Sequence, residues 1–118
     1  MFKAMILLSR RDDMTHEEFA GWLIGEHAPR AARLPGLRRL VYNLVEDGRD
    51  EAGIDGISEL WFDSSEAFDA AYATEIGRSV TADSMAHVRA RVRTFVTEHP
   101  VAGPNPASPD SPAEGSER

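Results

Sequence analysis

The first strand-like segment of the chain, residues 2–9, is apolar at most of its positions. Successive side chains of a strand point to opposite faces of the sheet, so a sheet built on this segment is apolar on both faces. A sheet that helices cover on one side usually turns polar residues to water on the other. We expect the second face to be covered by the same face of another copy, so the sequence predicts a homodimer.

The same two-sided pattern recurs in a second predicted strand, residues 57–63. Leu60 and Phe62 would lie on one face, with Ile57 and Trp61 on the other. Another β-rich segment, 37–45, precedes it across an acidic loop that contains glycine, which predicts an antiparallel hairpin. Residues 92–98 predict a further strand.

A helix is predicted between the first two strands. Thr15 and Glu18 have the spacing of a capping box, so the helix should begin at residue 15. Pro29 disfavours helical geometry at the residue before it. We therefore expect the helix to end or kink near His27.

A second helical region follows the hairpin. Asp63 or Ser64 would cap a helix there, and segments 76–80 and 84–88 predict shorter helical turns. The predicted order of elements is therefore β-α-β-β-α-β. This order predicts an α+β, ferredoxin-like domain with a four-stranded antiparallel sheet.

Composition narrows the classes of partner and of site. The chain has no cysteine, which excludes disulfides, thiolate metal sites and a cysteine nucleophile. The net charge of −7 argues against a nucleic acid or an anionic membrane as partner. No apolar stretch approaches the roughly 20 residues of a membrane helix, and the start of the chain favours a buried strand over a signal peptide. We expect a cytoplasmic protein.

The predicted domain covers residues 1–99. Residues 100–118 are rich in proline, serine and glycine and carry no large apolar side chain after Val101. Such a composition cannot bury enough surface to offset the entropy lost on ordering. We predict a disordered tail.

His27 is the candidate catalytic residue. Its spacing from Phe19 and Leu23 turns it inward, and it sits near the end of a helix. The helix dipole favours the imidazolium there, whereas burial favours the neutral ring. A pKa set by these opposing effects suits a general acid or base. The alternative is a core histidine that is hydrogen-bonded to the backbone.

Six strand residues are candidates for binding a substrate. Glu59 interrupts an apolar strand and would face a cavity or pair with a cation, for which Arg93 is the candidate. Tyr42 and Asn43 would offer hydrogen-bond donors. Trp61 and Phe95 would form walls for a flat substrate, or simply belong to the core.

No metal or cofactor site is predicted. The four histidines show none of the spacings HxH, HxxxH and HExxH, and the sequence lacks GxGxxG, Walker A and G-x-S-x-G patterns.

Three stretches of the chain carry a family resemblance. Residues 14–43 contain T-H-E-E-F, a tryptophan, E-H-A-P and L-P-G-L-R in this order, and residues 55–71 and 91–99 follow with DGISELWFDSSEAFDAA and RVRTFVTEH. Together they span almost all of residues 1–99 and resemble the EthD family. The resemblance implies a dimeric α/β barrel in which two sheets pack face to face around a cavity. It also implies that His27, within E-H-A-P, lines this cavity.

The resemblance leaves the reaction open. Related dimeric barrels include cofactor-free polyketide cyclases, lactone isomerases, fungal decarboxylases and dehydratases, and heme- or oxygen-handling enzymes. The preferred hypothesis is a cofactor-independent enzyme of catabolic or secondary metabolism that acts on a small carbonyl or hydroxyaromatic metabolite, with His27 as acid or base and with Tyr42, Asn43 and Glu59 orienting the substrate. The alternatives are an EthD family reductase or oxidoreductase, and a non-catalytic protein that binds a metabolite for a partner monooxygenase.

Overall fold

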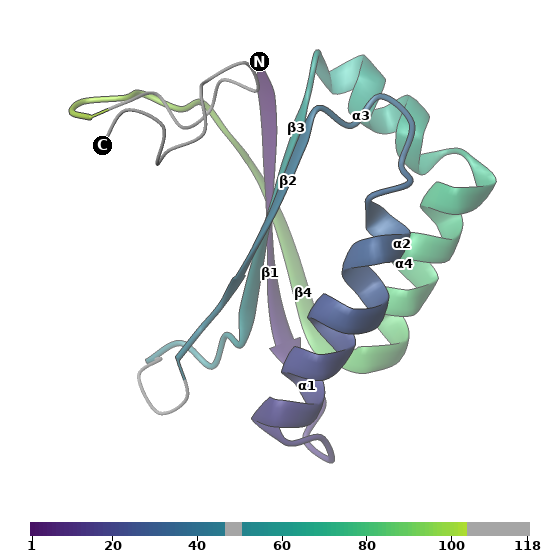
Figure 1. The fold of residues 1–118 in the computed structure, drawn as a ribbon, viewed down its shortest axis with the longest axis vertical. Coiled ribbons are helices and arrows are strands. Elements are labelled where there is room, and N and C mark those ends of the chain that lie inside the picture. The colour runs from purple at the N-terminus through teal and green to yellow at the C-terminus, as the bar shows by residue number, and fades with distance from the viewer. Residues whose placement is uncertain (47–50, 104–118) are drawn as a thin grey trace.

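The computed structural model of the chain describes residues 1–46 and 51–103. Within them, one four-stranded antiparallel sheet carries the helices on one face and leaves the other face open (Figure 1). The strands lie in the order β2-β3-β1-β4, with bounds β1 (Phe2–Arg10), β2 (Arg39–Leu44), β3 (Gly56–Phe62) and β4 (Val88–Val96). This order is that of a ferredoxin-like sheet, so the predicted α+β fold is confirmed.

The face of the sheet toward the helices is the base of the hydrophobic core. Ala4 of β1 lies opposite Leu60 of β3, Ile6 lies opposite Ser58, and all four residues are buried. Burial of large side chains against this face is the main source of stability in a domain of this size. The core includes Leu8, Phe19, Leu23, Phe62 and Phe68.

The open face carries apolar side chains, as the alternation in the strands predicts, beside a polar group of Lys3, Glu59 and Asn43. Met5, Leu7 and Ile57 are half-buried there. Val92 of β4 lies opposite Leu7 and is 57% exposed. An exposed apolar row along a sheet is unusual for a surface that faces only water.

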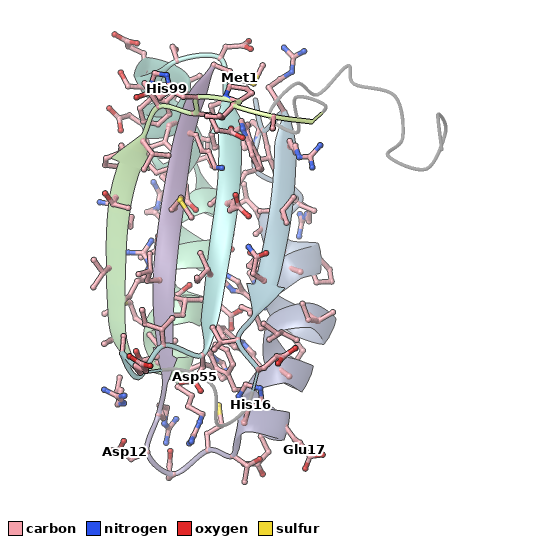
Figure 2. The ribbon with its side chains drawn as sticks, turned by 90° about the vertical axis from the view of Figure 1, so that its left-hand side faces the viewer. Met1, Asp12, His16, Glu17, Asp55 and His99 are labelled. Carbon is pink, nitrogen blue, oxygen red and sulfur yellow. The ribbon has the colours of Figure 1, made fainter. Side chains whose placement is uncertain are left out.

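The chain after β4 crosses one end of this open face, near Met1 (Figure 2). Glu98 in this crossing segment accepts a hydrogen bond of 3.0 Å from Nε1 of Trp61. As a result Trp61 is only 3% exposed although it points away from the helices.

The first helix begins where the sequence predicts. α1 (His16–Trp22) has Thr15 as its N-cap, and Thr15 and Glu18 complete the capping box. The N-cap oxygen and the Glu18 carboxylate bind backbone N–H groups that the first helical turn leaves without partners.

Near His27, where the sequence predicts an end or a kink, the helix changes its hydrogen bonding but does not end. The helix runs on through a π-helical turn, η1 (Leu23–His27), into α2 (Ala28–Ala31). In the wider turn the N–H of Ala28 donates to the carbonyl of Leu23. Pro29 is the second residue of α2, where its missing N–H costs little because the hydrogen-bonding pattern has already changed.

The second helical region is longer than predicted. α3 (Ser65–Tyr72) has Ser64 as its N-cap, and α4 (Glu75–His87) is one continuous helix where the sequence predicted two short turns. A Cβ atom at Gly77 would lie 2.3 Å from the carbonyl oxygen of Ala71. Glycine at this position therefore lets α4 start tightly against the end of α3.

The last strand begins directly after α4, ahead of its predicted start at residue 92. Apart from residues 100–103, the predicted tail lies outside the described residues and remains a prediction. Among the helices of the described chain, none has the length and apolar character required to cross a membrane.

Candidate functional site

His27 is the last residue of the η1 turn and lies between the helices and the sheet. It is 3% exposed. Its Nδ1 lies 2.8 Å from Oδ2 of Asp83, which belongs to α4. π-Helical turns are frequent at functional sites because the extra residue changes which side chains face inward. Here the turn carries the imidazole to a carboxylate of another helix.

Burial sets the protonation of this pair. Burial lowers the pKa of His27 below its ordinary 6.5, and the hydrogen bond with Asp83 opposes this effect without reversing it. Burial raises the pKa of Asp83, but hydrogen bonds from His27 and Trp22 outweigh it and hold the pKa below 3.8. At neutral pH the pair is a neutral imidazole beside a carboxylate. Because a carboxylate only accepts hydrogen bonds, Nδ1 carries the proton and Nε2 is unprotonated.

Three side chains surround the imidazole. The Oγ of Ser84 lies 3.3 Å from Nε2, so the hydroxyl can donate to it. The ring of Tyr42 meets the imidazole edge-on at a centroid distance of 6.1 Å, and the ring of Trp22 lies at 4.9 Å. Burial raises the pKa of Tyr42, so its hydroxyl stays protonated at neutral pH.

Further groups fix Asp83 in position. Nε1 of Trp22 donates to Oδ1 over 3.3 Å, and Nδ1 of His87 lies 3.5 Å from the same oxygen. The half-exposed Arg30 approaches Oδ2 at 3.7 Å. Asp83 is therefore held between helices in an orientation that serves His27.

The structure corrects the predicted place of His27. The resemblance implied that it lines a cavity between the sheets of two subunits. In the structure it contacts Tyr42, which lies in one row across the sheet with Ser58 and the core residue Ile6. That row faces the helices, so His27 lies inside one copy of the chain, on the side of the sheet away from the open face.

Three predicted binding residues share the helix-facing side with His27: Tyr42, Arg93 and Phe95. Arg93 lies opposite Ile6, and Phe95 lies opposite Ala4. Both are exposed, because β4 is an edge strand that the helices cover incompletely. The Arg93 guanidinium lies 5.9 Å from the ring centroid of Phe68 and 6.0 Å from that of Phe95.

The other predicted binding residues lie on the open face. Lys3 lies 2.7 Å from the carboxylate of Glu59, and Asn43 donates to that carboxylate over 2.8 Å. The predicted pairing of Glu59 with Arg93 is wrong, because the two side chains lie on opposite faces. Burial raises the pKa of Glu59, but Lys3 and Asn43 outweigh it and hold the pKa below the ordinary value. Trp61 lies under Lys3 at 4.5 Å, in this same group.

Sequence reasoning missed several residues of the helix-facing cluster. Asp83 and Ser84 are more than 50 positions from His27 in the chain. Tyr72 and Arg91 were not singled out either. Asp83 and His87 are four positions apart, a spacing that predicts a contact on one face of a helix. The sequence does not show that His27 of another helix joins this contact.

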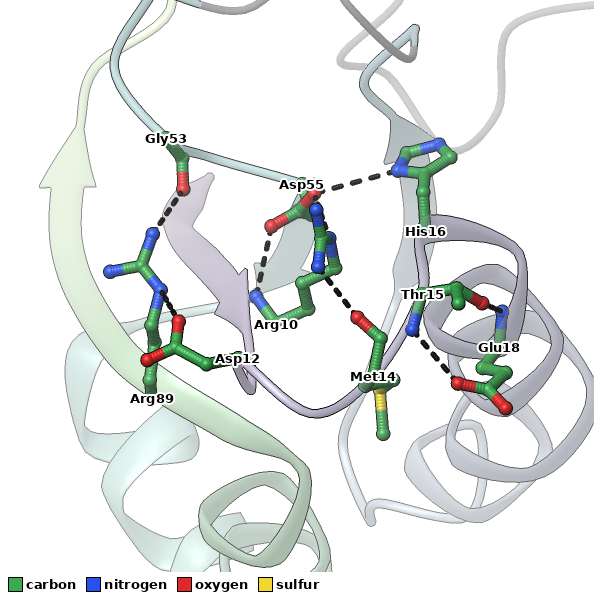
Figure 3. A network of polar contacts seen from close by, with 9 residues as sticks. All are labelled: Arg10, Asp12, Met14, Thr15, His16, Glu18, Gly53, Asp55 and Arg89. Atoms are coloured by element: carbon green, nitrogen blue, oxygen red, sulfur yellow. Dashed lines mark hydrogen bonds and ion pairs between the residues drawn. The ribbon is translucent and has the colours of Figure 1, made fainter.

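A second polar cluster lies at the end of β1, where a groove of about 440 Å³ runs beside the start of α1. Figure 3 shows its network. Asp55 accepts hydrogen bonds from the backbone N–H and from Nε of Arg10, at 2.9 and 3.2 Å, and lies 3.4 Å from Nδ1 of His16. Arg10 also donates to the carbonyl of Met14. These contacts tie the strand end, the hairpin loop and the helix start together.

Among residues 1–46 and 51–103, no three histidine, aspartate or glutamate side chains are grouped so as to hold a metal ion.

Comparison with known families finds one matching model. The EthD domain model matches residues 11–91, which is more than half of the chain. No curated protein matches. The structure of an EthD family protein from Bacillus halodurans superposes with a TM-score of 0.72 at 22% identity, over 84% of this chain and 99% of that chain.

Two further solved structures have the same fold. A dimeric ferredoxin-like protein from Thermobifida fusca gives a TM-score of 0.67 at 16% identity, over 82% of this chain and 90% of its own. SnoaB, a cofactor-independent oxygenase from Streptomyces nogalater, gives 0.62 at 15% identity, over 82% of this chain and 91% of its own. At these identities the likeness concerns the fold.

Proposed function

The chain belongs to the EthD family, and we propose that it is a cofactor-independent enzyme that transfers protons on a small carbonyl or hydroxyaromatic metabolite. The observation that carries this proposal is the buried His27–Asp83 pair, with Nδ1 2.8 Å from the carboxylate. Asp83 fixes the ring and its tautomer, and Nε2 is the general base.

The chemistry follows from the protonation of the pair. Nε2 removes a proton from a carbon next to a carbonyl, and the electron pair moves to the carbonyl oxygen to form an enolate. The imidazolium is stabilised by Asp83 and returns the proton in the next step. Isomerisation, elimination and ring closure are all completed by such an exchange of protons. The protonated Tyr42 hydroxyl, on the same side of the sheet, is the candidate donor that orients the substrate oxygen.

The Ser84–His27–Asp83 contact resembles a nucleophilic triad, but Ser84 lacks one essential part. Ser84 lies within α4 (Glu75–His87) and is 3% exposed. Backbone N–H groups in the interior of a helix already donate to carbonyls one turn earlier. They cannot form an oxyanion hole beside Ser84. We therefore assign to Ser84 the role of a hydrogen-bond donor that a substrate displaces.

Asn43 and Glu59 have no place in this site, because they lie on the open face with Lys3. The SnoaB structure supports a cofactor-independent reaction, since that oxygenase has the same fold. An oxidoreductase activity or a metabolite-binding role alongside a monooxygenase would not require the ordered His27–Asp83 pair.

We further propose that the active form is a homodimer that buries the open face. Met5, Leu7, Ile57 and the exposed Val92 support it, as does the dimeric state of the Thermobifida fusca protein. Sedimentation at micromolar concentration should give a species of twice the 13.0 kDa chain mass. A single species at the chain mass with the fold intact would contradict it.

Solvent exchange tests the enzyme proposal without knowledge of the natural substrate. Small ketones, keto acids and hydroxyaromatic carbonyl compounds are incubated with the protein in D₂O, and exchange of the α-hydrogens is followed by NMR. We expect exchange with at least one of them, and a loss of about 10²- to 10⁴-fold in His27→Gln. His16→Gln, in the second histidine–aspartate pair, is the matched control and should keep the wild-type rate. Exchange that survives in His27→Gln, or no exchange with any compound, would contradict the proposal.

A further inference from the structure

Two arginines of the edge strand point toward the helices. Arg91 lies opposite Leu8, and Arg93 lies opposite Ile6. Leu8 and Ile6 are both buried core residues on the helix-facing side of β1. The two guanidinium groups therefore lie on the side of the sheet that holds His27.

These arginines have no anionic partner within the part of the chain that the structure describes. Arg10, Arg11 and Arg38 each pair with an aspartate at 2.6 to 3.2 Å. Neither Arg91 nor Arg93 forms an ion pair with a residue of 1–46 or 51–103, and the buried Nε of Arg91 has no hydrogen-bond partner there. A guanidinium has five N–H donors, and leaving one buried without a partner is costly.

The neighbours of Arg91 suit an anion. Arg91 is half-buried, and this burial lowers the pKa of its guanidinium. Burial also raises the pKa of Tyr72, so this neighbouring phenol remains a neutral donor. The positive charge of Arg91 reaches His27 and lowers its pKa. Tyr72 and His27 are thus both within electrostatic reach of Arg91.

The surroundings of Arg93 suit a flat molecule. Its guanidinium lies 5.9 Å from the ring centroid of Phe68 and 6.0 Å from that of the half-exposed Phe95. Guanidinium groups bind carboxylates through two parallel hydrogen bonds and also stack on aromatic rings.

We propose that Arg91 and Arg93, with the Tyr72 hydroxyl, bind a carboxylate of the substrate at the β4 edge. This inference rests on the proposed function and narrows the substrate class to a small, flat carboxylate that also carries a ketone with a hydrogen on the adjacent carbon. The guanidinium groups hold the carboxylate so that a C–H next to the ketone of the same substrate faces Nε2 of His27, which removes this proton while the electron pair moves to the ketone oxygen. The same charges stabilise the enolate that forms when this proton leaves.

Binding of benzoate and of its neutral counterpart benzamide to the full chain tests the site. Calorimetry and NMR titration at low salt should show benzoate bound at least about tenfold more tightly than benzamide, as expected for a charge-assisted bidentate contact. Arg91→Gln should lower the affinity for benzoate by about tenfold or more and leave the affinity for benzamide unchanged. Arg93→Gln should act in the same direction. The control Arg33→Gln, which removes an equal charge from an exposed position after α2, should change neither.

His27→Gln separates this inference from the proposed function. It should bind benzoate within about threefold of wild type, because it leaves the carboxylate contacts intact. Discrimination between the two ligands without any α-hydrogen exchange would uphold the anion site and contradict the enzyme. Equal affinity for benzoate and benzamide, or no benzoate binding at millimolar concentration, would overturn the anion site. If Arg91→Gln does not fold, benzoate binding that is unchanged in Arg93→Gln would overturn it as well.

Discussion

The chain contains two histidine–aspartate pairs whose surroundings differ. His27 and Asp83 meet at 2.8 Å, and the His27 side chain is 4% exposed. His16 and Asp55 meet at 3.4 Å, and the His16 side chain is 19% exposed. Asp83 receives its hydrogen bonds from ring N–H groups of His27 and Trp22, whereas Asp55 is bound by both the backbone and the side chain of Arg10.

The difference shows why the same two residue types serve different purposes. At Asp55 an arginine already neutralises the carboxylate, so the pair joins elements of the fold. At Asp83 the carboxylate orients a buried neutral imidazole whose Nε2 lies 3.3 Å from the hydroxyl of Ser84. A base needs a free lone pair and a partner that stabilises its protonated form, and the buried pair provides both. The predictions that follow test this distinction.

Of the two aspartates, Asp83 should have the larger effect on exchange. Asp83→Asn keeps the shape of the side chain but loses the charge that fixes the tautomer and stabilises the imidazolium, so exchange should fall about 10²-fold or more. Asp55→Asn is the matched control in the other pair. We expect its exchange rate to stay within about threefold of wild type, because Asp55 contacts Arg10 and His16 and takes no part in the proton transfer. Equal losses in the two variants would remove the distinction.

Unlike the exchange rate, the stability of the fold should depend on Asp55. Asp55→Asn removes charge-assisted contacts with Arg10 and His16 and should lower the free energy of unfolding by about 1–3 kcal/mol. Urea unfolding followed by circular dichroism measures this loss. A variant with unchanged stability would show that the network of Figure 3 does not hold the strand end, the loop and the helix together.

The pH dependence of stability distinguishes the pairs without any substrate. The folded-state pKa of His27 is lower than the unfolded value near 6.5. As the pH falls, the unfolded chain therefore takes up the proton at a higher pH than the folded chain does. Protonation of His27 lowers the free energy of unfolding as the pH falls from 6.5 toward the folded-state pKa. Above pH 6.5 this loss of stability is absent. Each unit of pKa difference corresponds to about 1.4 kcal/mol.

His27→Gln provides the comparison for this measurement. Between pH 7 and pH 5 its free energy of unfolding should fall less than that of the wild type, because glutamine cannot take up a proton. A steeper fall in the variant would mean that the fold favours the imidazolium of His27.

A smaller effect is expected at Ser84. Ser84→Ala removes the hydroxyl beside Nε2, which a substrate displaces in any case, so exchange should change by less than about fivefold. Steady-state exchange rates at saturating ligand measure it. A loss as large as that of His27→Gln would identify Ser84 as a nucleophile.

The smallest effect is expected at His16. Its contact with Asp55 is long and partly exposed, and such contacts contribute about 0–1 kcal/mol. The free energy of unfolding of His16→Gln should therefore stay within about 1 kcal/mol of that of the wild type. A larger loss would place His16 among the residues that hold the network together.

The sequence predicted features whose causes are local. The capping box of Thr15 and Glu18 depends on residues three positions apart, and the two-sided strands depend on alternation within a few residues. Both are confirmed by the structure. The continuity of α4 was missed because polar residues such as Asp83 and Ser84 interrupt its apolar pattern, and these residues are polar because they face His27.

The site was predicted only in part for a similar reason. His27 and Tyr42 do meet, but the predicted set also included Glu59 and Trp61 on the opposite face. Alternation shows which residues share a face of one strand, yet it does not show which face the helices cover. That choice is made when the whole domain packs, and it decides that His27 lies within one subunit.

The protonation of His27 in the free protein tests the central claim most directly. Two-dimensional ¹⁵N–¹H NMR of the imidazole at pH 7 distinguishes the two neutral tautomers and the imidazolium. We predict a neutral ring with its proton on Nδ1, directed at Asp83, and a free Nε2. An imidazolium at pH 7, or a neutral ring with its proton on Nε2, would contradict the assignment of His27 as the base.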